Sequence, residues 1–377
     1  MSRTFIDIHI LQTVPPSNLN RDDTGSPKTA YYGGVRRSRV SSQAWKRATR
    51  VAFSDLLDPS ELGVRTKRVV EILATRIAQL APDLADRAGE LATETLKTAG
   101  IKTSTPKGEA DADQESGYLI FFSARQVDNL AEAAIAAARG GGKLTDGLKQ
   151  QDVKRLADRD HSVDIALFGR MVADIPDINV DAAAQVAHAI SVHAVENEYD
   201  YFTAVDDRKA AAEETGAGMI GTVEFNSATL YRYATVDVDR LADNLGDREA
   251  ARRAVEAFVR AFTTSMPTGK QNTFANRTLP DAVLVRLRER QPISFAGAFE
   301  EPVAARSGTG RIKEAATALA RYAGEVERAY GEAPVRSWVV RVGERTGALA
   351  ELGEDVTFDE LVAAVGAAVT ERAAVAV

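Results

Sequence analysis

Seven basic side chains and no acidic one lie between Thr24 and Arg50, in a chain whose formal net charge is −7. They are Lys28, Arg36, Arg37, Arg39, Lys46, Arg47 and Arg50. Residues 1–50 contain nine Lys or Arg and three Asp, whereas the rest of the chain is acidic on balance. A basic patch on an acidic body is typical of a protein that holds one anionic polymer in one groove. The segment therefore predicts an anion-binding surface.

The end of this segment predicts a helix that begins at Ser41 or Ser42. At the helical period, one face contains four polar side chains, namely Gln43, Lys46, Arg47 and Arg50. Serine hydroxyls and free backbone N–H groups at a helix start can also donate to phosphate oxygens. The alternative is a solvated basic face that binds nothing. The arginines that precede the helix have no compensating acids nearby, and this favours binding.

Two glycine-rich segments have some features of cofactor-binding motifs, but the sequence around them does not fit. GAGMIG at residues 216–221 has the glycine spacing of a dinucleotide-binding loop, but a predicted strand follows it where that motif needs a helix. GGGK at residues 140–143 lacks the first glycine and the final Ser or Thr of a phosphate loop. We therefore expect no cofactor.

Acidic and histidine pairs give weak support for catalysis. Asp22 and Asp23 are adjacent in a polar loop, as are the carboxylates at 206–207, and either pair could bind Mg²⁺ in a nuclease. Adjacent carboxylates in such loops are more often turn residues. His188 and His193 lie five residues apart on a predicted helix, which is a poor spacing for a shared metal ion. The residues alone therefore predict neither a metal site nor an enzyme.

Composition sets the broad class. With 377 residues, 45% hydrophobic and 27% charged content and no cysteine, the chain is typical of a globular protein without disulfides. Its length favours two or three domains, or one domain with large insertions. The first residues alternate charged and apolar side chains instead of forming a signal peptide, and no apolar run is long enough to span a membrane. We expect a cytoplasmic protein that does not bind membranes.

Hydrophobic periodicity predicts an α+β fold. Apolar Ile6, Ile8 and Ile10 alternate with polar residues, as in a strand with one buried face, and a long polar loop follows at 15–34. Residues 196–221 lack periodicity and are expected to form a protruding loop. The other predicted strands are at 118–122, 162–171, 222–237 and 282–289. The other predicted helices are two within 65–99, then 124–139, 181–196, 247–265, 311–331 and 357–373.

The segment IDIHILQTVPPSNLNRDDTGSPKTAYYGGVRRSRVSSQAWKRATR, residues 6–50, closely resembles the N-terminus of the CasC family, the multi-copy backbone subunit of the type I-E CRISPR Cascade surveillance complex. Further segments resemble the family in the same order: VDIALFGRM, AHAISVH, YFTAVDD, GTVEFNSATLYRYA and TGKQNTFA. The resemblance extends over roughly residues 1–300, and it is most specific between Asn18 and Arg50.

The resemblance implies an RRM-like (ferredoxin-like) palm with inserted helical fingers and an extended thumb loop. The implied palm comprises residues 1–57, 181–195 and 222–300. The fingers are expected at 58–180 and the thumb at 196–221, and residues 301–377 are expected to form a mostly helical C-terminal region. The aromatic RNA-binding signature of ordinary RRM domains is absent, so base stacking on the sheet is not expected.

The resemblance also implies which residues contact RNA. It assigns contacts with the RNA backbone to Arg21, Lys28, Ser41, Gln43, Lys46 and Arg50. Met171 matches an apolar wedge near a displaced base, and Phe202, Thr203 and Val205 lie on the implied thumb. The basic residues Arg36, Arg37, Arg39 and Arg47 are added to this site because they belong to the same acid-free segment.

The implied function is sequence-independent binding of CRISPR RNA. Several copies would stack along the guide and leave its bases free to pair with target DNA, so the expected partners are CRISPR RNA, target DNA through the RNA–DNA hybrid, further copies of the chain and other Cascade subunits. Such a subunit is not an enzyme. One alternative stays open, a metal-dependent ribonuclease that uses loop aspartates such as Asp22 and Asp23.

Overall fold

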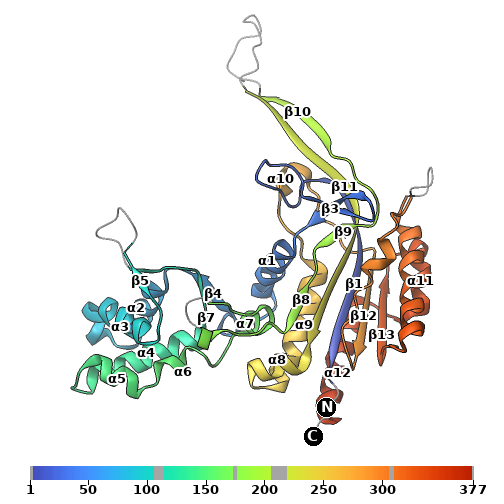
Figure 1. Cartoon of the computed structure of the whole chain (residues 1–377). Coiled ribbons are helices and arrows are strands. Elements are labelled where there is room, and N and C mark those ends of the chain that lie inside the picture. The colour runs from blue at the N-terminus through green and yellow to red at the C-terminus, as the bar shows by residue number, and fades with distance from the viewer. Residues whose placement is uncertain (1–2, 106–113, 173–175, 205–218, 305–309, 376–377) are drawn as a thin grey trace, which may run out of the picture. The chain divides into compact units, whose positions relative to one another are not determined.

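A computed structural model describes residues 3–105, 114–172, 176–204, 219–304 and 310–375. The chain forms two compact units (Figure 1). The first unit contains residues 1–52, 186–236 and 258–377, and the second contains residues 53–185 and 237–257. The predicted division into palm, fingers and thumb is finer than this and stays a prediction.

A large sheet organises the first unit. Its strands follow the order β14-β13-β12-β1-β11-β9-β3-β2, and β10 pairs with β11 beside this path. Their bounds are β1 Phe5–Ser17, β2 Thr29–Tyr32, β3 Val35–Val40, β9 Ala189–Ser191, β10 Glu198–Ala204, β11 Met219–Asp237, β12 Ala282–Arg288, β13 Arg336–Arg341 and β14 Glu354–Asp355. Strand β1 runs antiparallel to β12, with Phe5 opposite Arg288 and Leu11 opposite Ala282. The N-terminal strand therefore lies in the middle of the sheet.

Both faces of β1 are buried. Ile6, Ile8 and Ile10 are fully buried, as the alternation predicts. Asp7 and His9, which point the other way along the strand, are buried too, and the His9 ring stacks on Phe295 with centroids 4.5 Å apart. Helix α11 (Ile312–Tyr330) contributes to the hydrophobic cluster on that side. The face expected to be solvated is therefore covered by the C-terminal part of the chain.

The remaining helices of the first unit are α1 (Ser42–Ala52), α10 (Gln271–Phe274), α12 (Phe358–Val375) and the short η5 (Ala296–Phe299) and η6 (Glu344–Leu352). Helix α9 (Arg248–Thr264) begins in the second unit and ends in the first. Trp45 of α1 packs edge-on against Phe262 of α9, with ring centroids 6.5 Å apart. The guanidinium of Arg232 on β11 lies 3.7 Å from the Trp45 ring, so a cation–π contact fixes α1 on the sheet.

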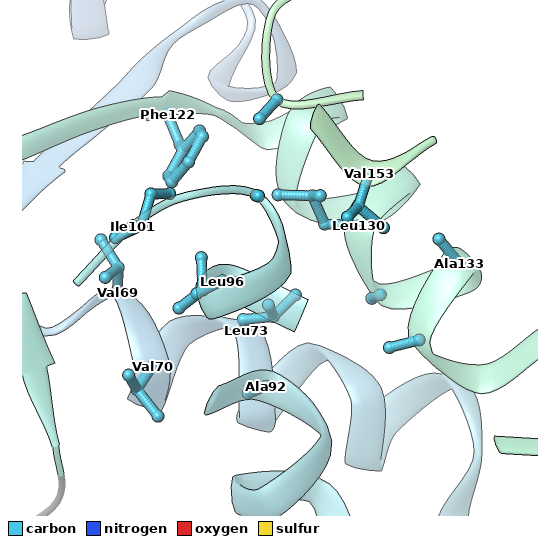
Figure 2. Close-up of a cluster of buried hydrophobic side chains, with 14 of the residues drawn as sticks. Val69, Val70, Leu73, Ala92, Leu96, Ile101, Phe122, Leu130, Ala133 and Val153 are labelled. Carbon is cyan, nitrogen blue, oxygen red and sulfur yellow. The ribbon is translucent and has the colours of Figure 1, made fainter. Parts of the chain in front are cut away.

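The second unit is mostly helical. Its elements are η1 Phe53–Asp55, η2 Pro59–Glu61, β4 Gly63–Thr66, α2 Val69–Leu80, η3 Pro82–Arg87, α3 Ala88–Thr98, β5 Thr103–Ser104, β6 Glu115–Ser116, β7 Ile120–Ser123, α4 Ala124–Arg139, α5 Leu144–Gln150, α6 Val153–Leu156, α7 Val163–Phe168, η4 Pro176–Ile178 and α8 Val238–Leu245, and β8 (Ala184–Val186) lies at its boundary. Leu73, Leu96 and Leu130 from α2, α3 and α4 meet in its core (Figure 2). Ser123 and Gln126 form a capping box at the start of α4.

The structure confirms several predicted elements and corrects three. The strands at 118–122, 222–237 and 282–289 and the helices at 124–139, 247–265, 311–331 and 357–373 are present within a few residues. Residues 163–168 form a helix instead of a strand, because five of these six side chains are buried and a short apolar run has no diagnostic period. Residues 181–196 contain β8 and β9 instead of a helix, since pairing with neighbouring strands overrides helix propensity.

The third correction concerns the thumb, and a strand that was not predicted lies in the C-terminal region. Residues 198–204 are a strand, β10, whose partner in β11 runs from Met219 to Phe225, so the described ends of the expected loop form a two-stranded arm. The C-terminal region is mostly helical, as expected, and also contains β13, which pairs with β12 and extends the main sheet. In both cases the pairing partner is distant in sequence, and local periodicity could not report it.

Within the described residues, no helix is both long enough and apolar enough to span a membrane.

Candidate nucleic-acid interface

The basic segment is built on a hairpin. Strands β2 and β3 pair antiparallel, with Tyr32 opposite Val35 and a two-residue turn at Gly33 and Gly34. Both glycines have positive φ, +59° and +77°, as this type of hairpin turn requires. A Cβ on Gly33 would lie 1.6 Å from the carbonyl oxygen of Glu300, so only glycine allows the turn to pack there. The hairpin is thereby fixed in position.

Arg37 is a structural residue of this hairpin. Its side chain is fully buried, and its guanidinium donates to the carbonyl oxygens of Ser191 (3.0 Å), Phe299 (2.8 Å) and Glu300 (3.1 Å), and also to that of Tyr32. Burial lowers the pKa of Arg37 below its ordinary value. Arg37 therefore does not belong to the exposed cationic face, and its contact with RNA stays a prediction. Its neighbour Arg36 is exposed.

The start of α1 is closed by hydrogen bonds within the protein. Ser41 is buried and accepts a hydrogen bond from the backbone N–H of Ala44 at 3.3 Å, so its hydroxyl caps the helix. The Ser41 N–H donates to Asn20 Oδ1 at 2.9 Å, and the Ser42 N–H donates to His188 Nδ1 at 3.2 Å. Asn20 and His188 therefore accept hydrogen bonds from backbone N–H groups that were expected to donate to phosphate. The contact of Ser41 with RNA stays a prediction.

The outer face of α1 matches the predicted arc. Trp45 and Thr49 are buried on the opposite side. Gln43 and Arg47 are exposed, and Lys46 and Arg50 are half-buried. The partial burial of Lys46 lowers its pKa below the ordinary value. Helix α1 therefore presents an amide and three cationic groups on one side.

A second cationic group adjoins the start of α1. Arg39 Nε donates to the carbonyl oxygen of Thr29 at 3.2 Å, and its Nη1 lies 3.4 Å from His188 Nδ1. Burial, then the charges of Arg39 and Lys28, lower the pKa of His188 below its ordinary value. A neutral histidine is what this geometry requires, because Nδ1 accepts the Ser42 N–H. His188 was considered only as a metal ligand from the sequence, and the structure places it with Lys28 and Arg39.

The loop before β2 presents Arg21 on its surface. Arg21 is exposed, and its backbone forms a bridge with Pro27. Asp22 Oδ1 accepts hydrogen bonds from Thr24 Oγ1 (2.7 Å) and from the N–H groups of Thr24 and Ser26. These bonds, that from the Thr24 hydroxyl first, lower the pKa of Asp22. Asp22 is a turn residue here, and the described residues contain no group of three side chains arranged to hold a metal ion.

The sequence reasoning missed one neighbouring element, the segment around α10. No acidic residue lies between Glu256 and Asp281, a second acid-free stretch that could have been noticed. Gly269 packs against Leu19, whose carbonyl oxygen would lie 2.3 Å from a Cβ at that position. This contact brings α10 next to the loop that presents Arg21. The polar side chains of this segment, exposed or half-buried, are Lys270, Gln271, Asn272 and Arg277.

The arm carries the predicted thumb residues. Phe202 lies opposite Gly221, and a Cβ on Gly221 would be 2.4 Å from the Phe202 ring, so the ring covers the glycine. Phe202 is nevertheless 40% exposed. Thr203 is paired with Ile220 in the backbone ladder. Val205 lies outside the described residues.

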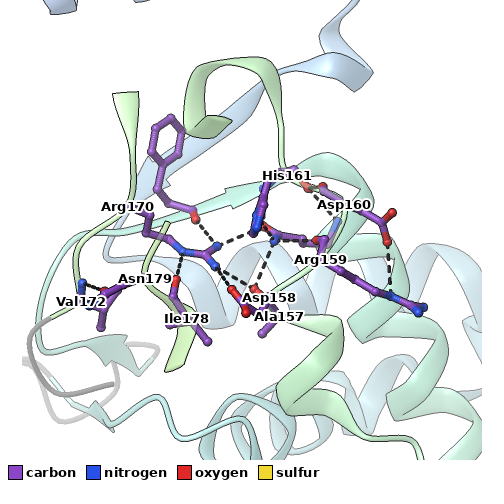
Figure 3. Close-up of polar contacts among 12 residues, drawn as sticks. Ala157, Asp158, Arg159, Asp160, His161, Arg170, Val172, Ile178 and Asn179 are labelled. Atoms are coloured by element: carbon purple, nitrogen blue, oxygen red, sulfur yellow. Dashed lines mark hydrogen bonds and ion pairs between the residues drawn. The ribbon is translucent and has the colours of Figure 1, made fainter. Parts of the chain in front are cut away.

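Met171 belongs to the second unit and is 87% exposed. The residue before it, Arg170, is buried and donates to the carbonyl oxygens of Phe121 (3.1 Å), Ala157 (3.0 Å) and Ile178 (2.7 Å) (Figure 3). Burial lowers the pKa of Arg170 to about 10, against the opposing charge of Asp158. The hydrogen bonds of Arg170 thus fix the loop that exposes Met171.

The predicted site residues therefore fall into groups. One unit brings together Arg21, Lys28, Arg36, Arg39, Gln43, Lys46, Arg47, Arg50 and Phe202. Arg37 and Ser41 belong to the same unit but are buried. Met171 lies in the other unit and is described separately.

The fold and the site together define an α+β protein in which an exposed cationic helix face accompanies a sheet of this strand order. Residues 6–364 match the model of the Cas_CT1975 family, described as CT1975-like protein, and the chain belongs to this family. A search of curated proteins found no match for it.

Two solved structures are similar over nearly the whole chain. One, described as "CRISPR RNA-guided surveillance complex, pre-nicking", is 37% identical with a TM-score of 0.83 and covers 97% of this chain and 100% of that chain. Another, "CRISPR RNA-guided surveillance complex", is 33% identical with a TM-score of 0.72 and covers 97% of this chain and 99% of that chain. The family and both structures confirm the resemblance to a CasC-like subunit that the sequence indicated.

Proposed function

We propose that this protein is the backbone subunit of a type I-E CRISPR surveillance complex. It binds CRISPR RNA without regard to sequence, polymerises along the guide and presents its bases to target DNA. The observation that carries the proposal is the exposed face of α1 with Gln43, Lys46 and Arg47, next to Lys28 and Arg39, in a chain whose structural relatives belong to RNA-guided complexes.

The chemistry of this face supports binding through the RNA backbone. Its groups are cations and an amide, which suit phosphate and ribose oxygens and carry no information about base identity. Single-stranded RNA held in this way keeps its Watson–Crick edges free. The lysine and arginines of α1 would therefore hold any spacer equally well.

An RRM-like palm is part of the proposal. Along the path β12-β1-β11-β9, the strands occur in the order fourth, first, third, second when numbered along the chain. Helix α1 lies between β1 and β9 in sequence, and α9 lies between β11 and β12. This alternation of strands and helices is that of a ferredoxin-like βαββαβ unit, and it supports the assignment.

We propose further that the subunit is not an enzyme. Asp22 is engaged in a turn by Thr24 and Ser26, which argues against the ribonuclease alternative. Incubating the assembled complex with complementary RNA and Mg²⁺ tests this. Periodic cleavage that is lost in the variant Asp22→Ala/Asp23→Ala would overturn the non-enzymatic role.

The test of RNA binding is a variant of the α1 face. Lys46→Ala/Arg47→Ala should lose most of the co-purifying RNA while melting near the wild-type temperature, because Trp45 and Thr49 still anchor the helix. The matched control is Arg321→Ala/Arg328→Ala, which removes the same charge from exposed positions of α11 in the same unit. RNA retained by the wild type should be sequenced, and guides of uniform length that contain the repeat are expected. A folded α1 variant that keeps full-length guide RNA would exclude this face as the binding surface.

A further inference from the structure

One acidic residue, Glu224, lies next to the predicted cationic site. Glu224 is on β11 at the base of the arm, opposite Tyr199 of β10. Its carboxylate contacts the loop that runs from Asn18 to Lys28 and presents Arg21. A carboxylate so close to an RNA-binding loop repels phosphate, so its presence calls for another reason.

The contacts of Glu224 connect three segments. Its Oε1 accepts a hydrogen bond from Ser26 Oγ at 2.8 Å, and its Oε2 accepts one from Asn197 Nδ2 at 3.0 Å. Its backbone carbonyl oxygen accepts a hydrogen bond from Asn18 Nδ2 at 2.9 Å. Asn18 Nδ2 also donates to the carbonyl oxygen of Gly25 at 3.0 Å, so both ends of the loop are tied to the same point on β11.

The network continues to the basic hairpin. Asn197 Oδ1 accepts from Asn226 Nδ2 at 3.1 Å, and Asn226 Oδ1 accepts from the hydroxyl of Ser38 on β3 at 3.1 Å. Lys28 in turn pairs with β3 through its carbonyl oxygen, which accepts the Arg39 N–H at 2.9 Å. The loop, the hairpin and the arm are therefore connected by side chains centred on Glu224.

We propose that Glu224 is a positioning residue, which locks the Asn18–Lys28 loop to the base of the arm and so holds Arg21 and Lys28 in the geometry that binds RNA. This inference rests on the proposed function. The direction of the change in RNA affinity distinguishes this positioning role from a purely electrostatic role. Removing a negative charge beside an RNA site strengthens binding if the charge only repels RNA, whereas it weakens binding if the charge positions the cations.

Three variants test the proposal. Glu224→Ala removes both side-chain contacts, and Glu224→Gln keeps an oxygen that accepts from Ser26. Ser26→Ala removes the hydroxyl donor and leaves the arm unchanged. The matched control is Asp200→Ala, which deletes the same charge from an exposed residue of β10 whose side chain has no hydrogen bond or ion pair among the described residues.

Two measurements are needed on each full-length variant. The first is the dissociation constant for a single-stranded RNA of guide length. We expect Glu224→Ala to weaken binding about tenfold, the size of one lost hydrogen bond to a charged group, with smaller losses in Glu224→Gln and Ser26→Ala and none in Asp200→Ala. Binding by folded Glu224→Ala that equals or exceeds wild-type binding overturns the proposal.

The second measurement is hydrogen exchange of the Asp22, Ser26 and Lys28 amides in RNA-free protein, where each N–H donates to an acceptor within the loop. Exchange should accelerate in Glu224→Ala and Ser26→Ala and stay unchanged in Asp200→Ala. If the wild type retains no RNA yet these amides respond, the proposed function fails and the lock stands. If they do not respond, the lock itself is disproved.

Discussion

Two strands of the first unit carry arginines at similar spacing, and the structure uses them in opposite ways. Strand β3, VRRSRV, lies near one end of the sheet and leaves Arg36 exposed. Strand β12, AVLVRLR, lies between β1 and β13 and buries both Arg286 and Arg288. Burial, and not charge, decides which arginines are available to a ligand.

The difference lies in the acidic partners. Arg288 contacts the carboxylates of Asp7 (2.9 Å) and Glu327 (3.0 Å), and Arg286 also pairs with Glu327. Asp7 is fully buried, and its burial raises its pKa despite hydrogen bonds and the charge of Arg288. The exposed Arg36 of β3 needs no such partner. A basic residue without an acid nearby in the fold is the better candidate for binding an external anion.

The largest expected effect breaks the β12 side of this comparison. Arg288→Met leaves Asp7 buried without its ion-pair partner, and we expect the free energy of unfolding to fall by about 3–5 kcal/mol. Arg36→Met on β3 should change it by less than about 0.5 kcal/mol, because the side chain is exposed. Urea denaturation of both variants measures the contrast. Equal losses would mean that burial does not separate the two strands.

Arg37 tests the comparison within β3 itself. Arg37→Met leaves the carbonyl oxygens of Ser191, Phe299 and Glu300 without this donor, so we expect a loss of about 2–3 kcal/mol in unfolding free energy. Urea denaturation measures it, with Arg36→Met as the control. A variant as stable as wild type that binds RNA less well would restore Arg37 to the binding face.

Sequence reasoning located the basic segment because its signal is local. Seven cations without an acid over 27 positions need no knowledge of the fold, and the predicted polar face of α1 lies opposite the buried Trp45. It could not separate Arg37 from Arg36, because the carbonyl oxygens that bury Arg37 come from residues 191, 299 and 300. Alternation along β3 would have assigned the two side chains to opposite faces only if residues 35–40 had been recognised as a strand.

Errors in the fold have the same origin. The arm was expected to be a loop because β10 is stabilised by pairing with β11 across a long sequence separation. The short helix α7 and strand β9 lie in segments whose side chains are largely buried, and burial removes the polar side of the pattern on which periodicity depends. Helices with one solvated face were predicted well, whereas fully buried segments were predicted in some cases, as for β12, and missed in others, as for α7.

Two histidines that flank β9 extend the comparison to pH. His193 is buried, and burial lowers its pKa to about 4, whereas His188 is exposed beside Arg39. The unfolded chain binds a proton near pH 6.5 and the folded His193 does not, so this residue favours unfolding as the pH falls from 6.5 toward 4. We expect the wild type to lose about 2 kcal/mol through His193 between pH 7 and pH 5.

The measurement is urea denaturation at both pH values for wild type and for His193→Gln. The variant starts less stable, because the Thr229 N–H loses its acceptor on Nε2, but its stability should depend less on pH. His188→Gln is the exposed control and should keep the wild-type dependence more closely. An unchanged dependence in His193→Gln would show that folding does not lower the pKa of this histidine.

The smallest expected effect sharpens the role of the exposed cations one at a time. Each phosphate neutralised on single-stranded RNA contributes about 0.7 to the slope of log affinity against log salt concentration. Arg47→Gln keeps a long polar side chain on α1 but removes one exposed charge, so the slope should fall by about 0.7 if Arg47 contacts one phosphate. Arg37→Gln should leave the slope unchanged even if it weakens binding, since its guanidinium is bound to carbonyl oxygens inside the protein.

Titrations at several salt concentrations with two unrelated RNAs of equal length measure both slopes. Parallel lines for the two RNAs are expected, because phosphates carry no sequence information. A slope that falls with Arg37→Gln and not with Arg47→Gln would reverse the assignment of exposed and buried arginines on which the binding face depends.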